Sequence, residues 1–117
     1  MKRLMTLKRI ADENAVYLGS AGRSEENTGL GFAPAFYDFS TATTYRSRFA
    51  DGSDAPFHTL DGLPEAMIVR RAPSGRVLSA KPTLISGFVR DGFFYTRGNA
   101  ARAAREWTGE IDPIDEA

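Results

Sequence analysis

The 117-residue chain contains no cysteine, and this absence removes several classes of function at once. Without thiols there is no disulfide, no zinc–thiolate site and no thiolate nucleophile, so stability must come from packing and polar contacts. No apolar run approaches the roughly 20 residues that cross a bilayer. The basic start Met1-Lys2-Arg3 lacks the apolar run of a signal peptide, because Lys8-Arg9 follows too soon. We therefore expect a cytoplasmic protein that does not contact a membrane.

Signatures of catalysis and of cofactor binding are also missing. The sequence has no G-x-S-x-G elbow, no P-loop and no G-x-G-x-x-G fingerprint, and it offers one histidine. We therefore expect no catalytic residue and no cofactor, and we interpret the chain as a small binding module rather than an enzyme. With 42% hydrophobic and 26% charged residues it has the composition of an ordinary globular protein. Its length predicts a single domain over residues 1–117.

The net charge is zero, but the charges are arranged in blocks of alternating sign. Residues 1–10 are basic and residues 11–65 are acidic. Residues 66–105 then form the strongest basic block, and residues 106–117 are acidic again. This basic block could meet an external anion, or the acidic blocks could neutralise it within the folded chain. Because a net charge of zero gives weak long-range steering, internal neutralisation is favoured.

Hairpin patterns dominate the secondary structure that the sequence predicts. Residues 1–10 suit either a helix or an edge strand, whereas residues 15–19 suit a short strand. Turn residues then separate alternating segments, which predicts three hairpins. These are residues 32–39 with 43–49, residues 65–72 with 76–80, and residues 84–90 with 93–97. Pro34 would place the first half of residues 32–39 at a sheet edge or outside a ladder.

One helix is predicted near the carboxyl end. Asn99 can serve as its N-cap, and Ala100, Ala103, Ala104 and Trp107 then form one stripe. Gly109 and Pro113 end it, so residues 108–117 form an acidic tail. The predicted fold class is α+β. We expect a strongly curved antiparallel sheet or a small open barrel of about six strands in successive hairpins, with the helix packed on it.

The hairpin over residues 84–97 carries the leading functional hypothesis. Asp91-Gly92 is typical of a type I′ turn, which pairs Arg90 with Phe93 and Phe88 with Tyr95. Alternation then separates two faces. Ile85, Val89, Phe94 and Thr96 form an ordinary core face. The opposite face combines aromatic and cationic side chains, namely Leu84, Ser86, Phe88, Arg90, Phe93, Tyr95 and Arg97.

Aromatic rings beside cations are typical of surfaces that hold single-stranded nucleic acid, because rings stack on bases and cations meet phosphates. We therefore predict that the protein binds single-stranded or structured nucleic acid. The alternative is that the rings lie in the core beneath the helix. The predicted contact residues are Arg70, Lys81, Phe88, Arg90, Phe93, Tyr95, Arg97, Arg102 and Arg105.

A second hypothesis is a protein-interaction module, either a homodimer or an accessory or inhibitory factor that docks on a larger protein. The charge blocks could pair between copies, and edge strands readily pair with one another. A third hypothesis concerns His58, which lies among three carboxylates, Asp51, Asp54 and Asp61. Such a group could bind a divalent cation or form the acid/base group of a metal-dependent enzyme, but the spacing fits no calcium loop, and aspartate and glycine are also the residues that turns favour. We therefore predict a series of turns there, not a metal site.

Overall fold

The computed structural model describes residues 4–17 and 30–108, and these residues form an α+β fold with two helices and two antiparallel sheets. The helices are α1 (Leu7–Val16) and α3 (Arg97–Thr108). The smaller sheet has the order β1-β5-β4, from Met5–Thr6, Val77–Ala80 and Ile68–Arg71. The larger sheet has the order β3-β2-β6-β7, from Thr43–Arg46, Ala33–Asp38, Leu84–Arg90 and Phe93–Thr96. In this part of the chain no helix is both long enough and apolar enough to cross a membrane.

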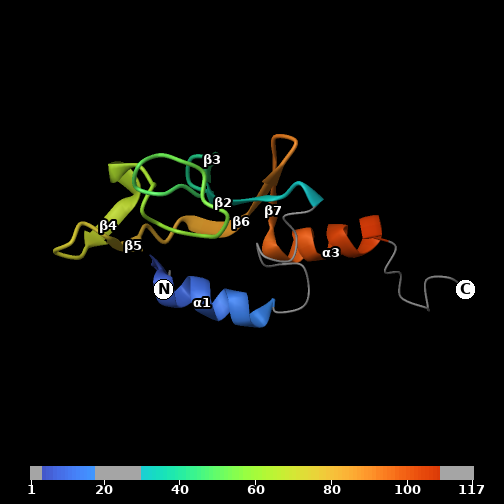
Figure 1. Cartoon of the computed structure of the whole chain (residues 1–117), viewed down its shortest axis with the longest axis horizontal. Helices are drawn as coiled ribbons and strands as arrows, with labels where there is room; N and C mark the ends of the chain where they lie inside the picture. The colour runs from blue at the N-terminus through green and yellow to red at the C-terminus, as the bar shows by residue number, and fades with distance from the viewer. Residues whose placement is uncertain (1–3, 18–29, 109–117) are drawn as a thin grey trace, which may run out of the picture.

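The predicted class is confirmed, but the single curved sheet or open barrel is not what the structure contains. The strands divide between two sheets because β1 pairs with β5 and β2 pairs with β6, and both pairings join segments far apart in the chain. Loop closure over such distances leaves no local signal in a sequence. As Figure 1 shows, β4 and β5 lie at one end of the molecule and α3 lies at the other.

The ambiguous amino-terminal segment contains both of the structures that its sequence allows. Residues 5–6 add a short strand to the smaller sheet, and α1 begins directly afterwards. Thr6 caps the helix, because its hydroxyl oxygen accepts a hydrogen bond of 3.0 Å from the backbone N–H of Arg9. The strand predicted over residues 15–19 is wrong, since residues 15 and 16 belong to α1; residues 18 and 19 lie outside the described residues.

Pro34 does not place its strand at an edge, because β2 lies inside the larger sheet; it lies instead outside one of the two ladders of β2, which was the other expectation. Ladder pairing between β2 and β3 starts only at Ala35, one residue further along the chain. The missing N–H of Pro34 therefore falls beyond the end of that ladder. The carbonyl oxygen of Pro34 still accepts a hydrogen bond of 2.8 Å from the N–H of Ser47.

The turn at Asp91-Gly92 has the predicted geometry. Both residues have positive φ angles, 52° and 83°, and the four strand pairs from Arg90–Phe93 to Gly87–Thr96 have the expected register. The strand ends one residue early, because Arg97 begins α3 instead of pairing with Ser86. The predicted N-cap at Asn99 is also wrong: the hydroxyl of Thr96 accepts a hydrogen bond of 3.1 Å from the N–H of Asn99.

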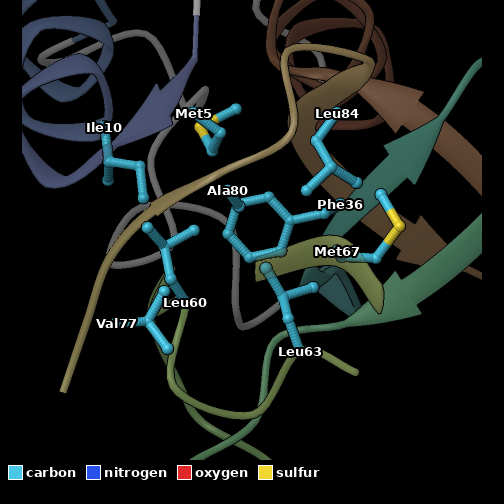
Figure 2. Packing of buried hydrophobic residues seen from close by; sticks show 9 residues of the cluster. All are labelled: Met5, Ile10, Phe36, Leu60, Leu63, Met67, Val77, Ala80 and Leu84. Atoms are coloured by element: carbon cyan, nitrogen blue, oxygen red, sulfur yellow. The ribbon is translucent and has the colours of Figure 1, made fainter. Parts of the chain in front are cut away.

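The main hydrophobic core joins the two sheets and α1. Side chains from both sheets, from α1 and from the loop between β3 and β4 meet in it, and Phe36 and Leu60 are fully buried (Figure 2). Its members are Met5, Ile10, Phe36, Leu60, Leu63, Met67, Val77, Ala80 and Leu84. The irregular loop therefore covers one face of the larger sheet and supplies core residues, although its turns gave no sign of this.

A second cluster holds α3 against the hairpin. Phe88, Phe32 and Ala100 are buried together, and Tyr95 and Ala103 pack against them. The predicted alanine stripe is confirmed for Ala100 and Ala104, which are buried. The side chain of Trp107, predicted to anchor the helix, lies outside the described residues. We call the face of the larger sheet that carries both clusters the inner face.

Gly87 lets the hairpin close tightly, and this gives a stability prediction. A Cβ atom built there would lie 2.2 Å from the carbonyl oxygen of Tyr95 and 2.4 Å from the ring of Phe94. Because backbone cannot move aside as a flexible side chain can, we expect Gly87→Ala to lower the free energy of unfolding by about 2 kcal/mol. Urea denaturation would measure this loss of stability. Gly98→Ala is the matched control, since its Cβ would meet nothing nearer than 3.6 Å and should leave stability equal or higher.

Candidate functional site

The hairpin face that the sequence predicted as a binding surface is the inner face of the sheet. Phe88 is fully buried, Arg97 is 3% exposed and Tyr95 is half-buried against the ring of Phe32 at 5.1 Å. Phe93 alone among the predicted rings is accessible, with 70% of its surface exposed at the hairpin tip. For Phe88 the structure therefore confirms the alternative interpretation, in which the rings of this face lie in the core beneath the helix. Alternation identifies which residues share a face, but tertiary packing decides which face is covered.

Arg97 is the centre of a buried polar network. Its Nε donates to Ser86 Oγ at 3.1 Å and lies 3.6 Å from Glu13 Oε2, and its Nη1 donates to Asn14 Oδ1 at 2.6 Å. Ser86 also donates to the carboxylate of Glu13. Glu13, Ser86 and Arg97 line a pocket of about 290 Å³ beside α1. The network ties α1 to β6 and to the start of α3, which gives Arg97 a structural role in place of the predicted contact with nucleic acid.

His58 completes this network from the loop. Its Nε2–H donates to the carbonyl oxygen of Gly87 at 2.7 Å, and its Nδ1 accepts from Arg97 Nη2 at 3.1 Å. Because a guanidinium can only donate, this geometry requires the neutral imidazole. Burial and the positive charge of Arg97 lower the pKa of His58 to about 3. The imidazole therefore stays neutral at physiological pH and holds the loop against the sheet.

The carboxylates near His58 in sequence do not converge on it. Asp51 accepts from the N–H and the hydroxyl of Ser53, and Asp61 accepts from the N–H of Val77 at 3.0 Å. Asp54 lies beside Arg46 and Arg48. Within residues 4–17 and 30–108 no group of three or more acidic or histidine side chains could hold a metal ion. These residues serve turns and ion pairs, as the turn interpretation predicts.

Several ion pairs join the acidic block to the basic block inside the chain. Glu13 pairs with Arg97, Asp61 lies 3.8 Å from Arg76, and Glu65 pairs with Arg71. These contacts support internal neutralisation of the charge blocks. They also leave less charge for pairing between copies.

The remaining predicted cations do not gather into one patch. Arg90 donates from Nε to the carbonyl oxygen of Leu30 at 2.8 Å, and its Nη1 lies 3.6 Å from Asp91. Arg70 and Lys81 are exposed beside the smaller sheet, whereas the other two predicted cations, Arg102 and Arg105, are exposed on α3 at the opposite end (Figure 1). The structure therefore does not bring the predicted contact residues together.

The opposite face of the larger sheet, which we call the outer face, carries Ile85, Val89 and Phe94, which the sequence assigned to the core, together with side chains of β2. Its half-buried members are Ala33, Tyr37, Ile85, Val89 and Phe94, whereas Ala35 is fully buried. The rings of Tyr37 and Phe94 stack with centroids 5.2 Å apart. At one edge of the larger sheet lies β7, and the turn between β6 and β7 projects from the body of the molecule (Figure 1). Phe93, the first residue of β7, pairs with Arg90, so its exposed side chain lies on the side of the inner face. The outer face together with β7 and its exposed Phe93 is the candidate functional site.

No family model, curated protein or solved structure matches this chain. A function can therefore be inferred only from the geometry of the outer face and of β7. The sequence carried part of the signal for that site, since alternation placed Ile85, Val89 and Phe94 on one face, but it placed Phe93 on the other. No signal marked the buried network, because Glu13, His58, Ser86 and Arg97 come from four separate segments.

Proposed function

We propose that this protein is a small protein-interaction module that associates with a second copy of itself through β7 and the adjoining outer face. The observation that carries the proposal is an edge strand made only of uncharged residues, Phe93–Thr96, that begins with a 70% exposed phenylalanine. Exposed aromatic residues are typical anchors of protein interfaces. A cytoplasmic location stays a prediction from the sequence.

The edge strands differ in how well they tolerate pairing with a copy of themselves. Two copies of β4 would bring Arg70 and Arg71 close to their counterparts, and β4 is also irregular, with register shifts against β5. Pairing of β3 with a second β3 would likewise bring Arg46 close to its counterpart. Charged residues and bulges are devices that block pairing at sheet edges, and β7 has neither. Antiparallel pairing of β7 with itself brings only Phe, Tyr and Thr side chains together.

Backbone geometry also favours β7 for strand addition. In a two-residue hairpin the residues beside the turn exchange hydrogen bonds, so Phe93 and Tyr95 direct their backbone groups towards β6. The N–H and C=O of Phe94 consequently point away from the sheet. A second strand laid along this edge would pair with them and would cover Phe93.

A protein partner fits the accessible rings better than nucleic acid does. Stacking on bases requires cations beside the rings to meet the phosphates. Arg97 is buried in the internal network, and Arg90, next to Phe93, contacts Leu30 and Asp91. The outer face has Arg46 on β3, and this residue lies near Asp54. The site is therefore rich in rings and poor in positive charge, as is typical of protein interfaces.

Sedimentation velocity over a range of protein concentrations tests the proposal. We expect the wild-type chain to dimerise and Phe93→Lys to weaken the dimer at least about tenfold, because the ring is no longer buried and two charges approach each other. Val69→Lys is the matched control, since Val69 is 52% exposed on β4 and outside the proposed interface. A wild-type chain that stays monomeric, or a dimer that Phe93→Lys leaves intact, would contradict the proposal.

The same protein samples test the nucleic-acid prediction. Fluorescence anisotropy with a labelled single-stranded oligonucleotide, at low and at high salt, should show no saturable binding if the proposal is correct. Phosphate contacts would make any affinity fall steeply with salt. Salt-dependent binding that Arg102→Gln and Arg105→Gln reduce would instead support a nucleic-acid partner on α3.

A further inference from the structure

A second pocket lies at the β3 edge of the larger sheet, the edge opposite to β7, and has features that the proposed dimerisation does not use. It has a volume of about 400 Å³ and lies where the end of β3 meets the loop that leads to β4. Its lining residues are Thr44, Tyr45, Arg46, Arg48, Gly62 and Pro64. Figure 1 places β3 at a distance from α3 and from the tip of the hairpin.

Local structure fixes the two arginines on one side of this pocket. Arg46 ends β3, and Arg48, two residues later, forms an isolated antiparallel bridge with Asp54. Side chains two positions apart on extended backbone point to the same side. Gly62 holds the loop against this segment, because a Cβ there would lie 2.5 Å from the carbonyl oxygen of Arg48. The walls of the pocket are therefore held together by backbone contact.

The charges in this pocket are not balanced. Arg46 Nη2 lies 3.7 Å from Asp54 Oδ2, and Arg48 Nε lies 3.6 Å from Asp54 Oδ1. Both distances exceed those of good hydrogen bonds. Among the described residues neither guanidinium has another ion pair or a side-chain hydrogen bond. One carboxylate thus stands between two guanidinium groups, which leaves an excess of one positive charge and several donors that face solvent, since both arginine side chains are about half exposed.

We propose that this pocket binds a small oxyanion, a phosphate or carboxylate group, between Arg46 and Arg48. The planar fork of a guanidinium matches two oxygens of such a group, and two forks side by side can hold it from two directions. Thr44, which lies on the same face of β3 as Arg46, lines the same pocket. Asp54 occupies the position of the anion in the free protein and acts as its internal competitor.

Because Asp54 competes with the anion, substitutions of Asp54 and of the two arginines should change the affinity for the anion in opposite directions. Arg46→Gln or Arg48→Gln should lower the affinity for the anion by about tenfold each, because each removes charge-assisted hydrogen bonds. Asp54→Asn should raise the affinity by a similar factor, because it removes the competing carboxylate. Arg102→Gln, the same change on exposed α3, is the matched control and should leave the affinity unchanged. Thermal melting of each variant confirms that it is folded.

The probes are inorganic phosphate, pyrophosphate and citrate, titrated at constant ionic strength into the full chain. NMR would follow the Nε–H signals of the arginines. Pyrophosphate binding with weaker citrate binding would identify a phosphate site, and the reverse order would identify a carboxylate site. The absence of saturation with all three probes, or saturation that the two arginine variants do not weaken, would overturn the proposal. Repeating the titration on Phe93→Lys separates this result from dimerisation.

Discussion

Replacing Arg97 with methionine should lower the free energy of unfolding by about 3 kcal/mol. Methionine fills much of the same space but donates no hydrogen bond. The change leaves Ser86 Oγ, Asn14 Oδ1 and His58 Nδ1 without the donor that each now uses, and it takes a guanidinium away from Glu13. Buried polar atoms that lose a partner bear the full cost of their dehydration.

Urea denaturation measures this effect as a lower midpoint with an unchanged slope. Arg102→Met, the same chemical change on an exposed residue of α3, should alter stability by less than about 0.5 kcal/mol. Arg97→Lys should fall between the two, since it keeps the charge but loses the planar fork that reaches several partners. A loss below about 1 kcal/mol for Arg97→Met would show that the network contributes little to stability.

Acidification should destabilise the protein through His58. The pKa of this imidazole is about 3 in the folded chain, against the ordinary value of 6.5 for a histidine in the unfolded chain. Between these two values the unfolded state binds a proton that the folded state does not bind. The stabilising contribution is therefore complete above pH 6.5 and is lost as the pH falls, by roughly 1 kcal/mol per pH unit.

His58 is the single histidine of the chain, so no other imidazole contributes to this pH dependence. Between about pH 5.5 and 6.5 a carboxylate of ordinary pKa stays ionised, so the slope of stability against pH in this window belongs mainly to His58. Asp38, whose pKa Ser40 lowers to about 2 by hydrogen bonding, titrates well below it. His58→Gln should be less stable at neutral pH and should lack the slope. An equal slope in His58→Gln would show that another group causes the acid sensitivity.

Local patterns in the sequence predicted local structure well. Asp91-Gly92 fixed the turn and the register of its hairpin, and the alanine stripe of α3 predicted its buried side. These features depend on interactions between residues that are close in the chain, so a short stretch of sequence is enough to predict them. Where two local signals competed, as in residues 1–10, the structure uses both.

The inner and outer faces of the larger sheet could not be assigned from the sequence. Both faces of the hairpin carry large apolar residues, and α3 and the loop with Leu60 decide between them by packing beside Phe88 and Phe36. The alternation of aromatic and basic residues in the hairpin therefore reflects the internal contacts of Phe88 and Arg97. Arg97 is charged because it satisfies a polar network, and Phe88 is aromatic because it fills the core.

Intermolecular NOEs in a mixture of isotope-labelled and unlabelled chains test the proposed association most directly. The account predicts contacts between copies from the rings of Phe93 and Phe94 and from the backbone of β7, with none from the exposed Val69 on β4. A mixture without intermolecular NOEs at concentrations where the chains associate, or with NOEs confined to α1 or β4, would contradict it.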